Sequence, residues 1–154
     1  MNVTYGKSWF RARKRFTETW DEGRARKSHD KRELYVAVVG QSSSPACFVE
    51  INNDYIGVAF LDTSLREYLS YQFQELEPGR LFLTMATHRE FEGGSDKVKS
   101  GTTYYFKQDG SVTIESEDFL TNTRSVKEAY TDVSGNWEPY PQFGQYLSII
   151  RENR

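Results

Sequence analysis

A run of short apolar segments separated by turn residues, from Glu33 to about Val133, most constrains the fold of this chain. The first segment, Leu34 to Val39, is continuously apolar and ends at Gly40, which indicates a buried strand. Several short strands at such spacing are typical of all-β proteins. We therefore predict an all-β (β-rich) fold: an antiparallel meander that forms a curved sheet or small barrel, with short helical or irregular N- and C-terminal segments.

One predicted hairpin has a register that its own apolar pattern selects. A two-residue turn at Asn53 and Asp54, which both tolerate positive φ, places six apolar residues on one face. The expected pairs are Ile51 with Ile56, Val49 with Val58, and Cys47 with Phe60. Because a slip of one residue would move this set to the other face, the register is well specified.

A second hairpin is expected around Gly110. A two-residue turn at Asp109 and Gly110 would pair Phe106 with the polar Thr113. A three-residue loop ending in Gly110 instead pairs Phe106 with Val112, and likewise Tyr104 with Ile114. We predict the second register, with Gly110 at positive φ and the four paired side chains on one face.

Two segments fit both a helix and a strand. Residues 65–76 follow a capping-box pattern at Ser64 and Glu67, but their alternation and their Tyr and Phe content favour a strand. A type II turn at Glu77–Arg80 should follow. In residues 8–22, the spacing of the aromatic residues suits either structure, and the density of Arg and Lys favours a helix that breaks at Gly23 and the polar run to His29.

The remaining segments complete a single predicted domain, residues 1–154. In the strand after the type II turn, Leu81, Leu83 and Met85 alternate with Phe82, Thr84 and Ala86. A further strand is expected at Arg124–Tyr130, and helical spacing from Phe143 to Ile150 predicts a short closing helix packed on the sheet. The domain divides into a basic N-terminal segment (1–32), the β meander (33–133) and a closing tail (134–154).

Charge is segregated along the chain. Residues 7–32 hold ten of the 20 Lys and Arg but four of the 22 Asp and Glu, so their net charge is +6 and that of the remainder is −8. Such asymmetry bears on partners more than on fold. It predicts a basic edge on an acidic body.

Motifs for catalysis are missing from the sequence. It has one Cys and two distant His, with no HExxH, no GxSxG and no glycine-rich phosphate loop. We expect no enzyme activity, no cofactor and no metal, and we interpret Cys47 as an inert core thiol. Neither a signal peptide nor an apolar run of about 20 residues is present, so no membrane association and a cytoplasmic location are expected.

Two acidic clusters are the predicted partner-binding residues. One lies in the stretch 90–96 and the other at a strand end, 115–118, and in a meander both should reach the same end of the sheet. An acidic surface would steer a basic protein partner, although a merely solvated face is the simpler interpretation. The predicted residues are Glu90, Glu92, Asp96, Glu115, Glu117 and Asp118.

The basic segment is the other candidate site. From Trp9 to Phe16 it interleaves cations with aromatic side chains, as single-stranded nucleic-acid binders do. The pI of about 5.8 counts against nucleic acid. The alternative is that Trp9, Phe16 and Trp20 dock onto the acidic body and the cations neutralise it.

Three stretches resemble small bacterial immunity proteins encoded beside polymorphic toxins, the Rhs-type and other type VI effectors. They are Tyr55–Asp62 (YIGVAFLD), Leu65–Phe73 (LREYLSYQF) and Arg80–Ala86 (RLFLTMA), within a resemblance spanning about 33–133. The resemblance implies a cytosolic immunity protein that binds and neutralises a cognate toxin domain, expected to be basic. It transfers no functional residue. The alternatives are a single-stranded nucleic-acid-binding module and a lipocalin-like barrel for a small apolar ligand.

Overall fold

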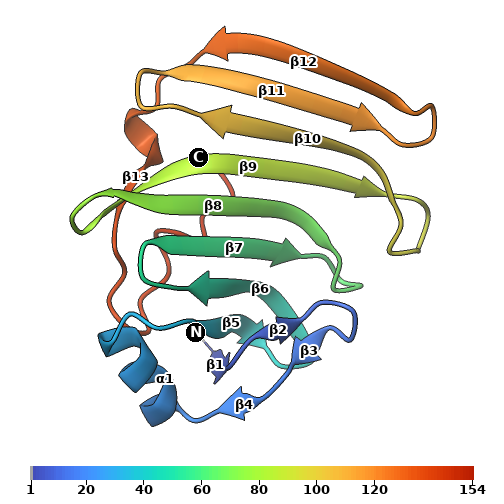
Figure 1. Ribbon diagram of the computed structural model, residues 1–154. Coiled ribbons are helices and arrows are strands. Elements are labelled where there is room, and N and C mark those ends of the chain that lie inside the picture. Colours follow the sequence, from blue (N-terminus) through green and yellow to red (C-terminus); the bar gives the residue numbers. More distant parts are fainter. Residues whose placement is uncertain (1) are drawn as a thin grey trace.

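One antiparallel meander dominates the structure (Figure 1), a computed structural model that describes residues 2–154. Its main sheet has 11 strands in the order β12-β11-β10-β9-β8-β7-β6-β5-β1-β4, with β13 beside β9. The strands are β1 (Val3–Gly6), β4 (Thr19–Trp20), β5 (Tyr35–Gln41), β6 (Ser44–Ile51), β7 (Tyr55–Leu61), β8 (Glu67–Glu77), β9 (Arg80–Phe91), β10 (Val98–Phe106), β11 (Ser111–Asp118), β12 (Thr123–Tyr130) and β13 (Trp137–Pro139).

The all-β prediction is confirmed in its open form. The strand order is a path whose ends, β12 and β4, do not pair, so the sheet curves without closing into a barrel. The lipocalin-like alternative therefore lacks the closed wall that it requires.

Both hairpin registers are confirmed. Ile51 pairs with Ile56 and Cys47 with Phe60, although neither residue of the Asn53–Asp54 turn takes positive φ. In the second hairpin, Phe106 pairs with Val112 and Tyr104 with Ile114, and Gly110 has φ of 90°. Gly79 likewise has φ of 73°, as the predicted turn between β8 and β9 requires.

Segment 65–76 is a strand, β8, as predicted. The candidate capping box is not used, because the Asp62 carboxylate accepts hydrogen bonds from the backbone N–H groups of Ser64 and Arg66, at 2.9 Å each. Leu65 takes φ of 59°, which ends the turn and starts the strand.

Of the two structures that fit residues 8–22, the structure contains strands, not the helix that the Arg and Lys content favoured. This segment forms a small hairpin, β2 (Trp9–Phe10) with β3 (Arg15–Phe16), followed by β4. The hairpin places Trp9 opposite Phe16, so both rings pack on the main sheet together. The one α-helix among the described residues, α1 (Glu22–Asp30), lies where a break was predicted. Its N-terminus is fixed by Asp21, whose carboxylate accepts from the Arg24 N–H at 2.8 Å.

The helix predicted for the tail is also wrong, although the tail does pack on the sheet. A 3₁₀ turn, η1 (Ser134–Asn136), leads into β13, which pairs with the start of β9. Beyond it, the N–H groups of Ile149 and Ile150 bond the Tyr146 carbonyl in a single turn. Tyr146 and Ile149 are completely buried, so packing positions these side chains without a regular helix.

Strand pairing defines the two faces of the sheet. One ladder runs Glu50, Gly57, Gln72, Met85, Tyr105, Thr113, Glu128, and its side is here called the groove face. The neighbouring ladder runs Val49, Val58, Tyr71, Ala86, Tyr104, Ile114, Lys127 on the opposite side, the tail face.

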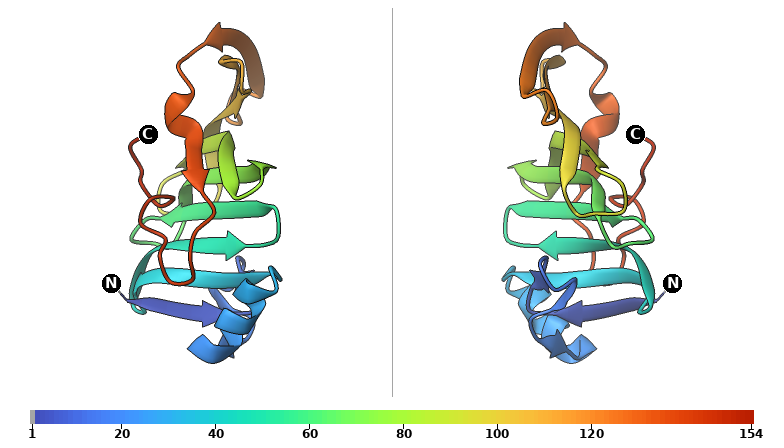
Figure 2. Two further views of the ribbon diagram at one scale, coloured as in Figure 1. Left: turned by 90° about the vertical axis from the view of Figure 1, so that its left-hand side faces the viewer. Right: turned by 90° about the vertical axis from the view of Figure 1, so that its right-hand side faces the viewer.

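The covering segments reach only part of the sheet. The tail and α1 pack on the tail face, and the β2–β3 hairpin packs on the groove face, over the strands from β1 to β8. We call β1 and β5–β8 the covered half, and β10–β12 the outer half. Figure 2 shows the outer strands rising beyond the segments that cover the rest.

Candidate functional site

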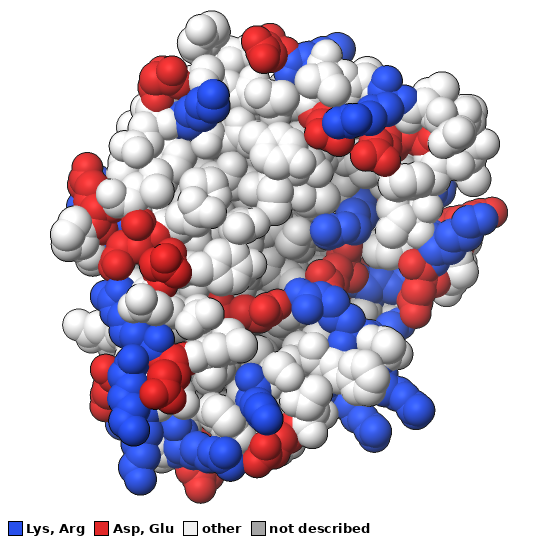
Figure 3. Space-filling model, viewed as in Figure 1, with Lys and Arg blue, Asp and Glu red and all other residues white. Residues whose placement is uncertain are grey.

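Three adjoining hollows form a groove across the groove face, and Arg89 lines all of them. The central hollow, of about 170 Å³, lies over β7 and β8. A second, of about 460 Å³, opens toward the β2–β3 hairpin, and a third, of about 180 Å³, opens toward β10 and β11. Figure 3 shows an uncharged area across the middle of this face, with charged side chains gathered around it.

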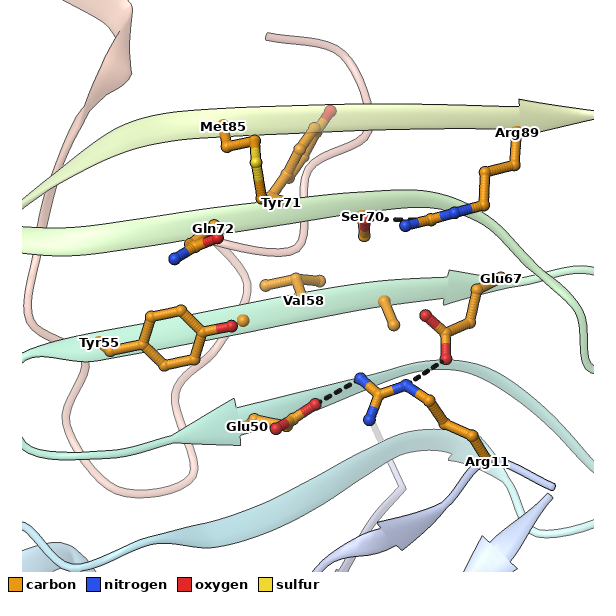
Figure 4. A pocket seen from close by; sticks show the side chains of 12 residues that line it. Arg11, Glu50, Tyr55, Val58, Glu67, Ser70, Tyr71, Gln72, Met85 and Arg89 are labelled. Carbon is orange, nitrogen blue, oxygen red and sulfur yellow. Dashed lines mark hydrogen bonds and ion pairs between the residues drawn. The ribbon is translucent and has the colours of Figure 1, made fainter. Parts of the chain in front are cut away.

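Arg11 closes one side of the central hollow. The turn between β2 and β3 carries it over the sheet, where its Nη2 lies 2.6 Å from Glu50 Oε1 and its Nε lies 2.8 Å from Glu67 Oε1 (Figure 4). Burial opposes the charge, but these two carboxylates raise the pKa of the Arg11 guanidinium above its usual value. Arg11 is therefore a fixed charge whose hydrogen bonds are already directed at the protein itself.

Arg89 has no such partner. It projects from β9 into the groove, and the hydrogen bond it makes is from Nη1 to Ser70 Oγ, at 3.2 Å (Figure 4). Among residues 2–154, no carboxylate lies within ion-pairing distance of its guanidinium, although the side chain is half-buried. Because a guanidinium has five N–H donors, Arg89 retains capacity for a carboxylate or carbonyl group brought by a partner.

Tyr55 forms part of the floor of the groove. Its ring lies across β7 because Gly57 has no side chain: a Cβ there would be 2.7 Å from the Tyr55 hydroxyl oxygen. Burial raises the pKa of Tyr55 above its usual value, so the hydroxyl stays protonated and can donate. The groove therefore offers neutral and cationic donors side by side.

The outer half of the sheet exposes large apolar side chains on the groove face. Phe119, 52% exposed, lines the third hollow, and Tyr105 is 41% exposed on the same face. Val126 and Tyr130 of β12 are exposed on the same face, at 55% and 82%, beyond the residues that line the hollow. Aromatic residues on an open, half-polar surface are the usual anchors of protein interfaces.

The six predicted acidic residues do reach one end of the sheet. Ser100 pairs with both Glu90 and Asp118, and Gly101 pairs with Glu117. They divide between the faces, however. Glu115 and Glu117 lie on the groove face and line the third hollow, Glu90 and Asp118 lie on the tail face, and Glu92 and Asp96 are in the connecting loop.

Several of these acids have partners within the chain. Glu115 pairs with Arg124 at 2.8 Å, Glu92 with Lys97 at 3.3 Å, and Asp96 with Lys14 at 2.9 Å. The Asp118 carboxylate accepts hydrogen bonds from the N–H groups of the turn that follows it. That these residues bind a partner stays a prediction, and Glu115 and Glu117 are the two that border the groove.

Half of the cations in the basic N-terminal segment are used by the protein itself. Arg11, Lys14, Arg24, Arg26 and Arg32 each pair with a carboxylate. Trp9 stacks on Phe48 with ring centroids 5.3 Å apart, and Phe16 meets Trp9 edge-on at 5.7 Å. Trp20 packs against the core on the tail face. The docking of the three rings on the body is therefore confirmed. The expected neutralisation of the body is seen only in part, because Arg24 and Arg26 pair with Glu18 and Glu22 of the segment itself.

Sequence reasoning missed Arg11 and Arg89. The partners of Arg11 are 39 and 56 residues away along the chain. Simple alternation from Leu81 and Leu83 would place Arg89 on the tail face, but the register shifts between Gln72 and Phe73 and turns it to the groove face. No local pattern in the sequence predicts that shift in register.

Other candidate sites can be described briefly. Among residues 2–154, no group of three or more His, Cys, Asp and Glu side chains is arranged to hold a metal ion. Cys47 is buried as predicted, and burial raises the pKa of its thiol to about 12. No helix in the described part of the chain is long and apolar enough to cross a membrane.

No protein-family model, no curated protein and no solved structure matches the chain. The resemblance to immunity proteins therefore stays a prediction.

Proposed function

We propose that this chain is a non-catalytic binding protein that captures a protein partner on the groove face of its outer half. The partner that fits the resemblance to immunity proteins is a cognate toxin domain. The observation that carries the proposal is the bare outer half of the sheet. Of the three strands β10–β12, Val112 is the one buried residue. Phe119 is exposed in the third hollow, and Tyr105 and Val126 are exposed on the same face.

The exposure of the outer half supports this proposal, because apolar side chains in contact with water cost free energy that a bound partner would recover. Phe119 lies opposite Lys99 and Tyr105 lies opposite Thr113, so exposed aromatic side chains stand at both ends of the β10–β11 pair. Large apolar side chains that a monomer leaves exposed often mark a protein-interaction site. Phe119 and Tyr105 would supply the apolar anchor of an interface, and anchors of this kind supply most of its binding energy. On the covered half, the rings of Trp9 and Phe16 pack on one face of the sheet, and Tyr146 and Ile149 of the tail pack on the other.

Charge supports a partner with a basic surface that also bears an acidic group. Glu115 and Glu117 border the third hollow, and rim charges of this kind accelerate encounter with an oppositely charged protein. Arg89, which lacks a carboxylate partner in the chain, would receive one from the bound protein. The contact surface of the partner should therefore be basic at its rim and carry one carboxylate at its centre.

The test uses the product of the reading frame next to this gene, expressed in a bacterial host with and without the chain. If the proposal is correct, that product arrests growth alone, co-expression restores growth, and the two purified proteins form a complex of one to one. A neighbouring product that is harmless, or that the chain neither binds nor neutralises, would contradict the toxin-inhibitor proposal.

Matched variants locate the interface in that complex. Phe119→Ala should weaken binding at least tenfold, as expected for an interface anchor. The control is Leu147→Ala, an exposed apolar side chain on the tail, 66% exposed, which should not change binding. Reversing Glu115 and Glu117 to Lys should slow association about tenfold, and reversing Glu90 on the tail face should not. Equal effects from both faces would show that the groove is not the docking surface.

A further inference from the structure

The edge strand β12 is a second unused surface, separate from the groove. It is eight residues long, every one of them is exposed, and its pairing with β11 runs from Thr123 to Tyr130 without a register shift. It contains neither Pro nor Gly. The opposite edge, β4, has two residues. Natural proteins shorten, bulge, cover or charge such edges. Strand β12 carries Arg124, Lys127 and Glu128, but it is neither shortened, bulged nor covered, so its backbone can pair with a strand whose charges complement these.

The alternation of hydrogen-bonded pairs between β11 and β12 shows which backbone groups of β12 have no partner within the sheet. The Thr131 N–H donates to the Gly110 carbonyl at 2.9 Å, so these residues form a hydrogen-bonded pair. Such pairs alternate along an antiparallel ladder, which assigns Ala129, Lys127, Ser125 and Thr123 to bonding with β11. The N–H and C=O groups that point away from the sheet therefore belong to Arg124, Val126, Glu128 and Tyr130.

We propose that a second copy of this chain pairs with β12 through a two-fold axis at Val126. An antiparallel pair related by a two-fold axis perpendicular to the sheet keeps each face continuous, so residues of like parity meet. In this register Val126 faces Val126 of the second copy, and Arg124 faces its Glu128. The symmetry repeats that charge pair, and all the outward N–H and C=O groups from 124 to 128 are satisfied.

The neighbouring registers are less favourable. An axis at Lys127 would oppose two lysines directly, and an axis at Ser125 would leave Arg124 opposite Val126. Directly opposed like charges destabilise a strand pair, whereas opposite charges stabilise it. Arg124 already pairs with Glu115 of its own chain at 2.8 Å, and its remaining N–H donors are sufficient for a second carboxylate.

The dimer places both groove faces on the same side of one continuous sheet. This proposal does not rest on the proposed function, because β12 pairs through its edge and a groove-bound partner would lie on the face. Edge pairing of two short strands buries less than a standard interface, so we expect a dissociation constant in the micromolar range. Sedimentation of the full chain from about 1 µM to about 1 mM should show a monomer–dimer equilibrium.

Charge reversal tests the register. Glu128 makes no ion pair within residues 2–154, so Glu128→Arg should leave the fold intact and weaken self-association at least tenfold, because two arginines then meet. Arg124→Glu breaks the exposed pair with Glu115, which contributes little to stability, and should likewise weaken self-association at least tenfold. Mixing the two variants restores both charge pairs, so the mixture should form a heterodimer. Two variants that remain monomeric when mixed would contradict this register.

A crosslink provides a readout that does not depend on charge. Cys47 is buried, so Val126→Cys introduces the one accessible thiol in the described residues. Across the proposed axis the two Cα atoms would be about 5.5 Å apart, within disulfide range. Oxidation should give a covalent dimer of Val126→Cys, while the control Thr123→Cys on the same strand should stay monomeric because its thiols lie far apart. A monomeric chain at every concentration, or equal crosslinking of both variants, would overturn the proposal.

Discussion

The covered half and the outer half of the sheet are made of similar hairpins but differ in what packs on them. Strands β5, β6 and β7 are mostly buried, because the tail lies on one face and the β2–β3 hairpin on the other. Strand β12, in contrast, is exposed along its whole length. Regular backbone pairing therefore continues well beyond the region where side chains form a core. The comparison separates two roles: the covered half supplies stability, and the outer half supplies surface.

The difference also concerns how easily each half opens. Local unfolding is expected where few apolar side chains are buried and backbone hydrogen bonds face solvent. Amide hydrogens of β11 and β12 should therefore exchange sooner than those of β5 and β6. Equal protection across the sheet would show that the two halves unfold as one unit.

The largest effect should come from emptying the core of the covered half. Phe73 is completely buried on the tail face, so Phe73→Ala removes a large apolar side chain and leaves a cavity. We expect a loss of about 3–5 kcal/mol in the free energy of unfolding, measured by denaturant titration. Phe119→Ala, in the outer half, is the matched control and should change stability by less than about 0.5 kcal/mol. Similar losses at both sites would remove the distinction between the halves.

A smaller effect is expected at the hairpin of the outer half. Gly110 has φ of 90°, and a Cβ at this position would lie 2.8 Å from the Thr131 carbonyl oxygen. Gly110→Val should therefore destabilise by about 1 kcal/mol or more, because a β-branched residue resists this conformation. Hydrogen exchange should show the opening concentrated in β10–β12, with β5–β7 unchanged. A uniform loss of protection would contradict local unfolding of the outer half.

The smallest effect concerns pH and the covered half. Burial against Tyr35, Tyr140 and Phe143 lowers the pKa of His29, so the folded protein favours the neutral ring. The stabilisation from the neutral His29 ring is fully present above the pKa of the unfolded chain, about 6.5. It is lost as pH falls from that value toward the lower pKa of the folded protein. Stability should therefore decrease between about pH 7 and pH 5, and His29→Gln should reduce the slope. An unchanged slope in the variant would assign the acid sensitivity to other groups.

The registers of the two hairpins could be predicted from the sequence, because each depends on residues close together in the chain. The register at Ile51 and Ile56 follows from one apolar pattern and one turn, and Gly110 marks its own loop. The N-terminal segment was predicted wrongly because Trp9 and Phe16 are placed by Phe48, a contact far along the chain. Arg89 was missed for a related reason, since a shift in the pairing of β8 with β9 decides which face it occupies.

The position of the tail has a consequence for the order in which this protein folds during synthesis. From β5 to β12 each strand pairs with its neighbour in sequence, so the ladder can grow as the chain emerges. Tyr35, however, donates or accepts a hydrogen bond at 2.9 Å with the hydroxyl of Tyr146, which is made 111 residues later. Until then, the part of the tail face of β5–β8 that the tail covers is exposed in the nascent chain. The outer strands β10–β12 are therefore synthesised before the core of the first strands is closed.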